Sequence, residues 1–424
     1  MIDGNPFLSD SFTSIWAKHF NAGDMGLEVA PFRPLRFVKQ GKLPFLINSG
    51  GTLTKGVDYE LQENIGPELN GKVLLVYDVP TYFESGTKEK HKNLGFYATK
   101  QYPGYLIALE EYKDIAHFMS STFSKSSRYK LNKYKRRLEE CFDIDYRMWF
   151  GHIPKDEYDS LFKDFRRLLE KRFDDKGTVN NNLDTKEWEF YKEVAYPMIL
   201  QKKAALFVIY DTGEPISVTL NYFSDTVVFD AITVFDIDYS KFHLGSVTVM
   251  KLIEWCIENK YGKLDFSKGF FEYKTRWANK TYDFEYHIYY DTTVLRSKSI
   301  AFALKTLFNL KQYLRDKRLN EKLHKLKFKL RNNAATPQNV PQYTFTEMDV
   351  NFDPSGLTPI DFKHAEHTNL KPIAFEFLYL NSESMKNLKI YLAKEDHLDY
   401  IFLGASKGIG VSISPRTEFI QKQS

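Results

Sequence analysis

Hydrophobic and polar residues follow two different periods along the chain, and the changes between them predict a mixed α/β protein. Apolar residues recur at helical spacing in some segments and alternate with polar residues in others. The predicted helices are residues 10–20, two helices within 111–142, and residues 155–173, 185–203 and 247–260. The predicted strands are residues 43–48, 72–80, 142–150, 204–211, 214–224, 226–236, 263–266 and 281–291.

The strands between residues 204 and 236 follow one another closely, with turn signals at Asp211-Thr212-Gly213 and at Ser224-Asp225. Short turns of this kind predict an antiparallel meander. The next strand, residues 263–266, comes only after a helix, and such a crossover is what a parallel neighbour requires. A sheet that changes here from antiparallel to parallel pairing offers a cleft at the change.

The stretch LDFSKGFFEYKTRW, residues 264–277, stands at the end of that parallel strand. Leu264 and Phe266 alternate with polar residues, Gly269 breaks the strand, and aromatic and charged residues crowd into the positions that follow. A turn at the end of a strand does not by itself require so many aromatic and charged residues.

At 424 residues the chain is long enough for two or three domains. Hydrophobic residues make up 43% of it and aromatic residues 16%, which excludes a disordered chain. We expect an N-terminal α/β region in residues 1–115, itself a candidate second unit of the same fold as the main domain, and a main domain in 116–300. A basic helical region (301–333) and a linker with a small C-terminal α/β appendage (334–424) follow.

The net charge of +4 is unevenly distributed, because residues 301–333 hold ten Lys or Arg against Asp316 and Glu321. Any anionic partner is therefore expected near this segment. The pattern of this segment predicts a helix that packs on the body of the protein and has a solvated basic face. The alternatives are a helix that lies on an anionic membrane surface and a basic patch that binds tRNA.

The sequence also points to a cellular setting. No apolar run approaches the roughly 18 residues of a membrane span, and MIDGNPFLSD lacks the features of a signal peptide. Cys141 and Cys256 lie in apolar helical patterns, so we expect reduced core thiols. These features predict a cytoplasmic protein, peripheral at the inner membrane face if the basic segment meets the membrane.

Residues 124–291 resemble the GNAT fold, that of the acyl-CoA-dependent N-acyltransferases. The similarity is to the branch that holds the FemAB-type peptidyltransferases and the CelD-like proteins, often labelled BioF2-like. It is carried by RYKLNKYKRRLEE, TVVFDAITVFD, DYSKFHLGSVTVMKLIEW and LDFSKGFFEYKTRW in this order, and NPFLSDSFTSIW also looks like the N-terminal region of that branch. The fold class implied is α/β with a mixed sheet.

The resemblance implies a donor site. In GNAT proteins a Q/R-x-x-G-x-G/A loop before a helix binds the pyrophosphate of CoA, and the loop here, residues 240–246, has one glycine and no Q/R in register. A helix N-terminus still favours phosphate, although Gly245 and Ser246 could simply cap the helix. The preceding strand would pair with the pantetheine arm, or be an ordinary core strand. The candidate donor-binding residues are Ile232, Thr233, Val234, Lys241, His243, Gly245, Ser246 and Val247.

The resemblance also implies proton-handling groups, since transfer to an amine needs a base and an acid. Tyr273 is the candidate acid and Asp265 a second proton-handling group, although a tyrosine here could equally fill the core. Asp230 interrupts an apolar strand, so it either faces the cleft as a base or acceptor anchor or pairs with a buried cation. The candidate acceptor-binding residues are Lys274, Arg276 and Trp277, although solvated lysines are the commoner case.

Three functions remain open from the sequence. The first is an acyltransferase that moves an acyl group from acyl-CoA, with acetyl-CoA foremost, to an amine on a sugar, lipid or cell-envelope precursor. The second is an aminoacyl-tRNA-dependent ligase of the FemAB type, and the third is a non-catalytic interaction protein that keeps the fold. We expect no metal, because His364 and His367 have no evident third ligand. LGASKGIG, residues 403–410, imitates a dinucleotide fingerprint, but too little chain follows it for that unit.

Overall fold

The structure of the protein is a computed structural model. It describes residues 4–61, 69–83, 85, 93–176, 183–317, 343–362, 364–393 and 399–413. The predicted basic region is therefore described only as far as Lys317, and the predicted linker lies outside the described residues.

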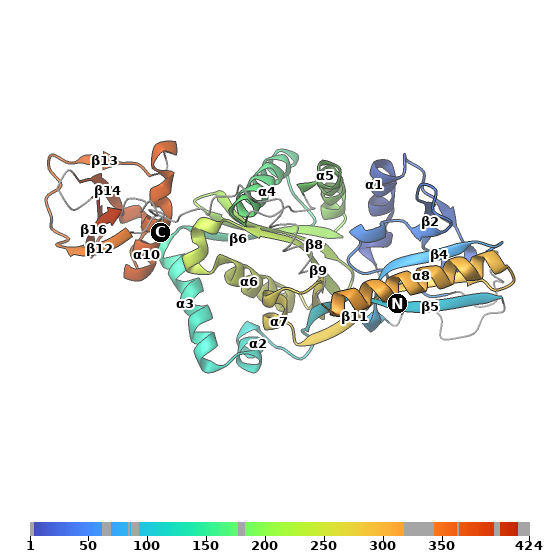
Figure 1. The fold of residues 1–424 in the computed structure, drawn as a ribbon. Helices are drawn as coiled ribbons and strands as arrows, with labels where there is room; N and C mark the ends of the chain where they lie inside the picture. Colours follow the sequence, from blue (N-terminus) through green and yellow to red (C-terminus); the bar gives the residue numbers. More distant parts are fainter. Residues whose placement is uncertain are drawn as a thin grey trace, which may run out of the picture.

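The predicted α/β fold is confirmed, and the predicted elements occur in the predicted order (Figure 1). The N-terminal part contains α1 (Asp10–Phe20), β1 (Leu27–Glu28), β2 (Arg36–Lys39), β3 (Leu46–Asn48), β4 (Val73–Pro80) and β5 (Leu94–Ala108). The middle begins with α2 (Ile115–Thr122), α3 (Lys125–Cys141), β6 (Ile144–Trp149), α4 (Lys155–Lys176), α5 (Thr185–Leu200), β7 (Ala204–Asp211), β8 (Glu214–Phe223) and β9 (Val227–Phe235). It continues with η6 (Ile237–Phe242), α6 (Leu244–Glu258), β10 (Lys263–Lys268), α7 (Glu272–Trp277), β11 (Lys280–Asp291) and α8 (Leu295–Asp316).

One sheet of 11 strands runs through both parts, in the order β1-β2-β3-β4-β11-β5-β10-β9-β8-β7-β6. β7 to β9 form the predicted antiparallel meander, β6 pairs antiparallel with β7, and β10 is parallel to β9. Helices α4 and α5 cover one face of its middle and α6 covers the other (Figure 1). The parallel neighbour predicted from the crossover is thus confirmed.

Strand β11 returns to the N-terminal part and pairs with both β4 and β5. Two glycines of β5 make room for its tyrosines, because a Cβ at Gly95 would lie 2.2 Å from the Tyr290 ring and one at Gly104 would lie 2.2 Å from the Tyr282 ring. The β11 insertion joins the two parts of the chain into one sheet.

The C-terminal unit is a separate antiparallel sheet of five strands, in the order β12-β16-β15-β14-β13. Its elements are β12 (Tyr343–Met348), β13 (Thr358–Ile360), α10 (Lys371–Asn381), β14 (Lys389–Leu392), β15 (Tyr400–Leu403) and β16 (Gly408–Ile413). The glycine-rich 403–410 stretch is the hairpin between β15 and β16, where Glu383 accepts hydrogen bonds from the N–H groups of Ala405 and Ser406. It is not a dinucleotide loop.

Both cysteines are free and buried, as predicted. Cys141 lies where the C-terminal unit meets the middle of the chain, with its thiol donating to the Leu378 carbonyl at 3.4 Å. Phe142 and Phe375 pack edge to face nearby, with ring centres 4.9 Å apart. The C-terminal unit therefore shares a core with the main domain.

Candidate active site

Strands β9 and β10 pair over a short distance and then part. Their parallel pairing covers Val227 to Phe229 opposite Lys263 to Asp265. On its other side β9 stays paired with β8, but Asn221 faces Asp230 and Leu220 faces Ile232, so Ala231 is an extra residue in a bulge. Among the described strands, none pairs with the β10 side of β9 beyond Phe229. The predicted donor-strand residues Ile232, Thr233 and Val234 lie on this open stretch. We call the place where β9 and β10 part, beyond Phe229 and Asp265, the opening.

Helix α6 begins beside the end of β9. His243, which precedes the helix, has a left-handed backbone with φ of 49°, and no side chain of the described chain caps the helix. A Cβ at Gly245 would lie 2.6 Å from the Phe235 ring, so only glycine lets the helix start this close to the strand. The N–H group of Gly245 therefore lies at the positive end of the helix dipole, next to the open strand edge. The N–H groups of Ser246 and Val247 donate to the His243 carbonyl at 2.8 and 3.2 Å.

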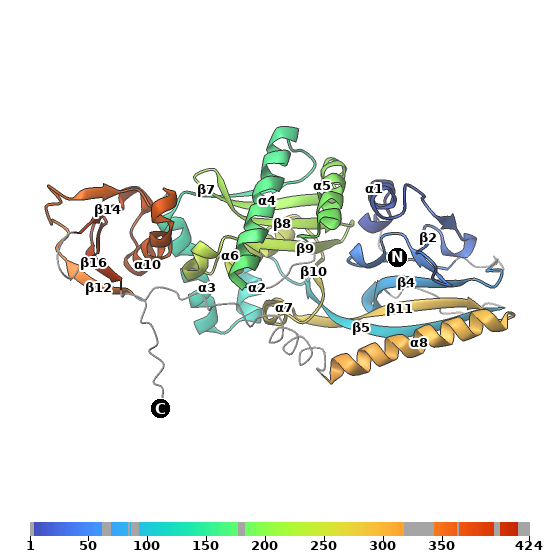
Figure 2. The ribbon, with the colours of Figure 1, turned by 45° about the horizontal axis from the view of Figure 1, so that its top comes forward.

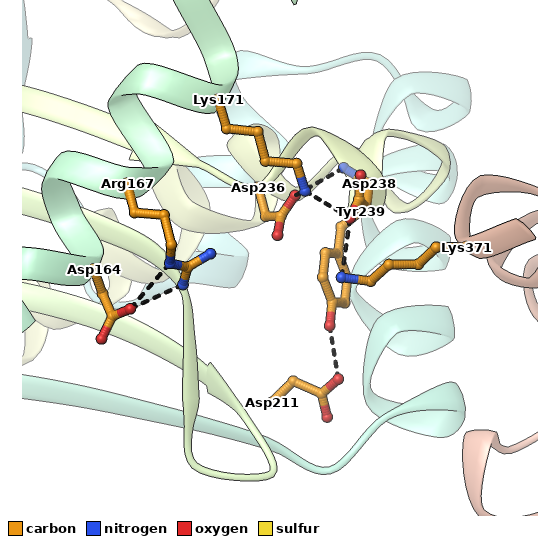
Figure 3. Close-up of polar contacts among 8 residues, drawn as sticks. All are labelled: Asp164, Arg167, Lys171, Asp211, Asp236, Asp238, Tyr239 and Lys371. Carbon is orange, nitrogen blue, oxygen red and sulfur yellow. Dashed lines mark hydrogen bonds and ion pairs between the residues drawn. The ribbon is translucent and has the colours of Figure 1, made fainter. Parts of the chain in front are cut away.

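The loop that leads into α6 is η6, and ion pairs fix both its sides (Figure 3). Lys171 of α4 lies 2.5 Å from Asp236 and 2.6 Å from Asp238. Lys371 of the C-terminal unit lies 2.9 Å from the same Asp238 carboxylate. Burial raises the pKa of Asp238, but the two lysines outweigh it, and the net pKa is lowered.

The predicted donor residue Lys241 also faces the C-terminal unit. Its ammonium lies 2.8 Å from Glu376 of α10. His243 stacks on Tyr134 of α3 with ring centres 3.9 Å apart. Burial, and then the charge of Arg276, lowers the pKa of His243, so its ring is neutral at pH 7. The side chains of this loop therefore bring little free positive charge to the start of α6.

Asp230 lies where β9 and β10 part, and it is 6% exposed. Thr233 donates a hydrogen bond to its carboxylate at 2.7 Å. Burial raises the pKa of Asp230, although the Thr233 hydrogen bond and the charges of Lys274 and Lys55 oppose the change. From the sequence, Asp230 could either face the cleft or pair with a buried cation. In the structure it is a buried carboxylate at the edge of the opening, with the charges of Lys274 and Lys55 near it.

Lys274 supplies one of these lysine charges. It is 5% exposed, and its ammonium donates to the carbonyl oxygens of Lys268 at 2.9 Å and of Ser267 at 3.3 Å. Burial lowers its pKa to about 8, although the Asp230 charge opposes this. Lys274 is thus a buried cation that gives up its proton near neutral pH.

The N-terminal part contributes residues that the sequence analysis missed. Burial, and then the charge of Lys268, lowers the pKa of Lys55, and the charges of Asp78 and Asp230 oppose the change. Gly56 brings the Lys55 loop against β9, because a Cβ there would lie 3.1 Å from the Phe229 ring. Nothing in the local sequence marks Lys55, since only the fold brings its loop to β9.

Lys268 and Asp78 form an ion pair between β10 and β4, with the Asp78 side chain fully buried. Asp78 and Ser267 both have φ of 60°, which non-glycine residues rarely adopt. Such strain persists only where surrounding contacts enforce it, and it is concentrated at functional sites.

Asp265 does not face the opening. It is 0% exposed, and its carboxylate accepts hydrogen bonds at 2.7 Å from the hydroxyls of Tyr82 and Tyr282 and from the Ser267 N–H. Burial raises its pKa to about 6. The expectation that Asp265 exchanges protons with a substrate is therefore corrected, because its oxygens are occupied; the residue positions the end of β10.

Tyr273 of α7 lies at the surface of the opening, and its ring is 40% exposed. Burial of its hydroxyl end, and then the Asp230 charge, raises its pKa. Arg276 is exposed, whereas Trp277 is 1% exposed and packs edge to face on Phe123 with ring centres 4.9 Å apart. The expected contact of Trp277 with a substrate is therefore corrected to a packing role.

Two surface hollows, of about 280 and 290 Å³, lie away from this site, one beside Trp16 and Gly41 and the other along α3. Among the described residues, no group of three His, Cys, Asp or Glu side chains could hold a metal. Within the same residues, none of the helices has the length and apolar character needed to cross a membrane.

Comparison with known proteins identifies the segment that holds this site. Residues 125–275 match the family model described as an acetyltransferase (GNAT) domain, and the match spans α3 to α7. It includes Asp230, Gly245 and Lys274. A comparison with curated proteins finds no match.

Several solved structures are similar to part of this chain at low sequence identity. FemX is 10% identical over 67% of this chain and 92% of that chain, with a TM-score of 0.47. A conserved protein of unknown function from Bacteroides thetaiotaomicron is 10% identical over 68% of this chain and 91% of its own, with a TM-score of 0.44. The C-terminal domain of a putative lysylphosphatidylglycerol synthetase from Agrobacterium fabrum is 12% identical over 65% of this chain and 86% of that chain, with a TM-score of 0.39.

Proposed function

We propose that this chain moves an acyl group from acyl-CoA to an amine acceptor, because residues 125–275 match the family model of an acetyltransferase (GNAT) domain. The acceptor amine belongs to a sugar, a lipid or a cell-envelope precursor. One observation carries the proposal: β9 and β10 part at Asp230, beside the start of α6 and next to the buried Lys274.

The donor fits this opening by general chemistry. The amides of a pantetheine arm can pair with the open edge of β9 at Ile232 to Val234, in the way an extended peptide adds to a sheet edge. Its phosphates then lie at the N–H group of Gly245 and beside Ser246, where the helix dipole favours anions. The thioester reaches the point where the strands part.

The reaction needs one proton to leave the amine and one to reach the departing sulfur. In the proposed step, the amine nitrogen bonds to the thioester carbon, the carbon–sulfur bond breaks, and Asp230 accepts the amine proton. Lys274 gives its proton to the thiolate, because its pKa of about 8 is close to the ~8.5 of a thiol. The raised pKa of Tyr273 makes it the poorer acid, so it serves to orient the thioester through its hydroxyl.

The acceptor side carries positive charge. Lys55 reaches this region from the N-terminal part, and exposed Arg276 follows Lys274 on α7. These two cations suit an acceptor that carries an anionic group besides its amine.

A second donor, aminoacyl-tRNA, is favoured by the charges of the η6 loop. Lys241 is paired with Glu376, and the pKa of His243 is lowered, so a CoA pyrophosphate would rest mainly on backbone N–H groups. The transfer chemistry at Asp230 and Lys274 would be the same, since an aminoacyl ester also presents an activated carbonyl.

Calorimetric titration with acetyl-CoA and longer acyl-CoAs tests the proposal. Wild-type protein is expected to bind at micromolar Kd. Ser246→Asp keeps α6 stable, because an acid suits a helix N-terminus, but its charge repels the donor phosphates and is expected to weaken binding at least about tenfold. Ser246→Ala, the matched control, stays within about threefold of wild type.

The other outcomes separate the alternatives. If no acyl-CoA binds and aminoacyl-tRNA supports transfer to an amine, the donor assignment changes and the site remains. If neither donor binds, the acyltransferase proposal is wrong and the fold serves as an interaction scaffold.

A further inference from the structure

Helix α8 has apolar side chains on two opposite sides. Its inner side packs against the sheet through Ala301, Leu304 and Phe308, and Phe308 stacks on Tyr286 with ring centres 3.9 Å apart. Its outer side carries large apolar residues in contact with solvent. We call this the outer face, and its members with their exposed fractions are Leu295 (77%), Phe302 (61%), Leu310 (52%) and Tyr313 (57%).

The spacing of the outer face places its residues together. Positions that differ by seven or eleven residues along a helix project from the same side. A helix that only had to cover the sheet would carry polar residues there, and single exposed apolar residues would need no explanation. Four on one side of a 22-residue helix form an apolar ridge, with Ser299 and Thr306 between them, and such a ridge is typical of a contact surface.

The charges of α8 and its flanks are nearly all positive. Arg296 and Lys298 follow the first residue of the outer face, and Asp316 is the acid of this helix. Long cationic side chains beside an apolar ridge extend toward the headgroups when a helix lies in a membrane surface. Arg296, Lys298 and Lys317 are cations of this kind. Lys305, Lys311 and Arg315 instead lie over the rings of Tyr97, Phe308 and Tyr102.

The last turn of α8 lies near the segment that precedes α7. Arg315, near the end of α8, lies over the Tyr102 ring of β5 at 3.6 Å, and Tyr102 contacts Phe270 with ring centres 6.3 Å apart. Phe270 and Phe271 are 64% and 58% exposed, and they precede α7. Figure 2 shows α7 beyond one end of α8.

We infer that the outer face of α8, together with Phe270 and Phe271, docks on the surface of an anionic phospholipid bilayer. The helix lies in the plane of the membrane, with its apolar ridge among the acyl chains and its cations at the headgroups. Two copies of this chain would bring like charges together across the same face. A nucleic acid would use the cations but would gain little from Leu295 and Leu310.

Flotation of the full chain with lipid vesicles tests this docking. Wild type is expected to float with vesicles that contain phosphatidylglycerol, and at least about tenfold less with phosphatidylcholine alone. Phe302→Ser with Leu310→Ser is expected to reduce binding to the anionic vesicles at least about tenfold. The matched control is Leu43→Ser with Leu380→Ser, two exposed leucines elsewhere, and it stays within about twofold.

A second pair of variants tests the charges. Arg296→Glu with Lys298→Glu is expected to reduce anionic binding at least about tenfold, and acids at the start of α8 do not weaken the helix. Lys39→Glu with Lys42→Glu, on the β2–β3 turn, makes the same charge change away from α8 and is expected to bind within about threefold of wild type.

The docking inference is wrong if wild type does not float, or if the outer-face variant floats as well as wild type. It is also wrong if wild type does not bind vesicles but instead binds single-stranded RNA or forms a dimer through the outer face. These outcomes do not depend on transfer activity, so they are independent of the proposed function.

Discussion

Tyr82 donates a hydrogen bond to the buried carboxylate of Asp265, with 2.7 Å between the two oxygens. Tyr82 follows β4 of the N-terminal part, and Asp265 belongs to β10, within the segment that matches the acetyltransferase (GNAT) family model. Tyr282 of β11 binds the same carboxylate from the strand that joins the two parts. The end of β10, and with it the opening beside β9, is therefore built by both parts of the chain.

Asp265→Asn is expected to change how stability depends on pH. Burial raises the pKa of Asp265 to about 6, above the ~3.9 of an unfolded chain. Its contribution is thus fully present below pH ~4 and is lost as the pH rises through about 6. The free energy of unfolding of wild type relative to Asp265→Asn should fall by on the order of 3 kcal/mol over this window.

Urea unfolding of both proteins at a series of pH values measures that difference, and other titrating groups cancel because both proteins share them. A difference that does not change with pH would show that Asp265 has the same pKa in the folded and the unfolded chain, which would contradict the raised pKa.

The transfer rate is expected to fall as the pH rises through about 8, because Lys274 then loses the proton that it gives to the leaving group. Lys274→Met should lower kcat by roughly 10²-fold. Lys274→Arg keeps a charge that does not titrate in this range, so the fall near pH 8 should disappear. Profiles of kcat against pH measure this, and a fall that persists in Lys274→Arg assigns the proton to another group.

Asp230→Asn is expected to lower kcat by roughly 10²-fold to 10³-fold and to leave the donor Kd within about threefold, because it removes the base but keeps the shape. Thr233→Val removes the hydrogen bond that lowers the Asp230 pKa. The acidic limb of the rate profile should therefore move to higher pH in Thr233→Val. Equal kcat in wild type and Asp230→Asn would remove Asp230 from the mechanism.

Lys371→Gln is expected to weaken donor binding about threefold to tenfold, because Lys371 holds Asp238 in the loop that leads into α6. Lys371→Arg should restore binding. The matched control is Lys386→Gln, because Lys386 forms an ion pair of 3.4 Å with exposed Asp143, and this pair does not involve the loop. Titration calorimetry measures each Kd. If Lys371→Gln and the control bind alike, the C-terminal unit does not position the donor loop.

The sequence predicted those features of the fold that depend on local pattern. Helix α6, strand β10 and their parallel crossover follow from periodicity and from the length of the connection. The place of Gly245 was also visible, although its cause, the contact with Phe235, was not. Pattern alone separates strands from helices, and this was enough to locate the opening beside β9.

Features that depend on long-range pairing were not predictable. The place of β11 between β4 and β5 depends on the close fit of tyrosines over Gly95 and Gly104. Lys55 comes to the site only because its loop packs on β9, and alternation could not tell that Asp265 points toward two tyrosines. Site residues supplied by a distant part of the chain leave no local signal.

Hydrogen exchange with and without acyl-CoA tests the central claim most directly, namely that the donor occupies the opening beside β9. Amides on the open edge of β9, in residues 230–235, and at the start of α6, in residues 244–245, should exchange more slowly with donor bound, because they gain hydrogen-bond partners. Amides of β15 in the C-terminal unit should not change. Donor binding without slower exchange at β9 and α6 would contradict the account.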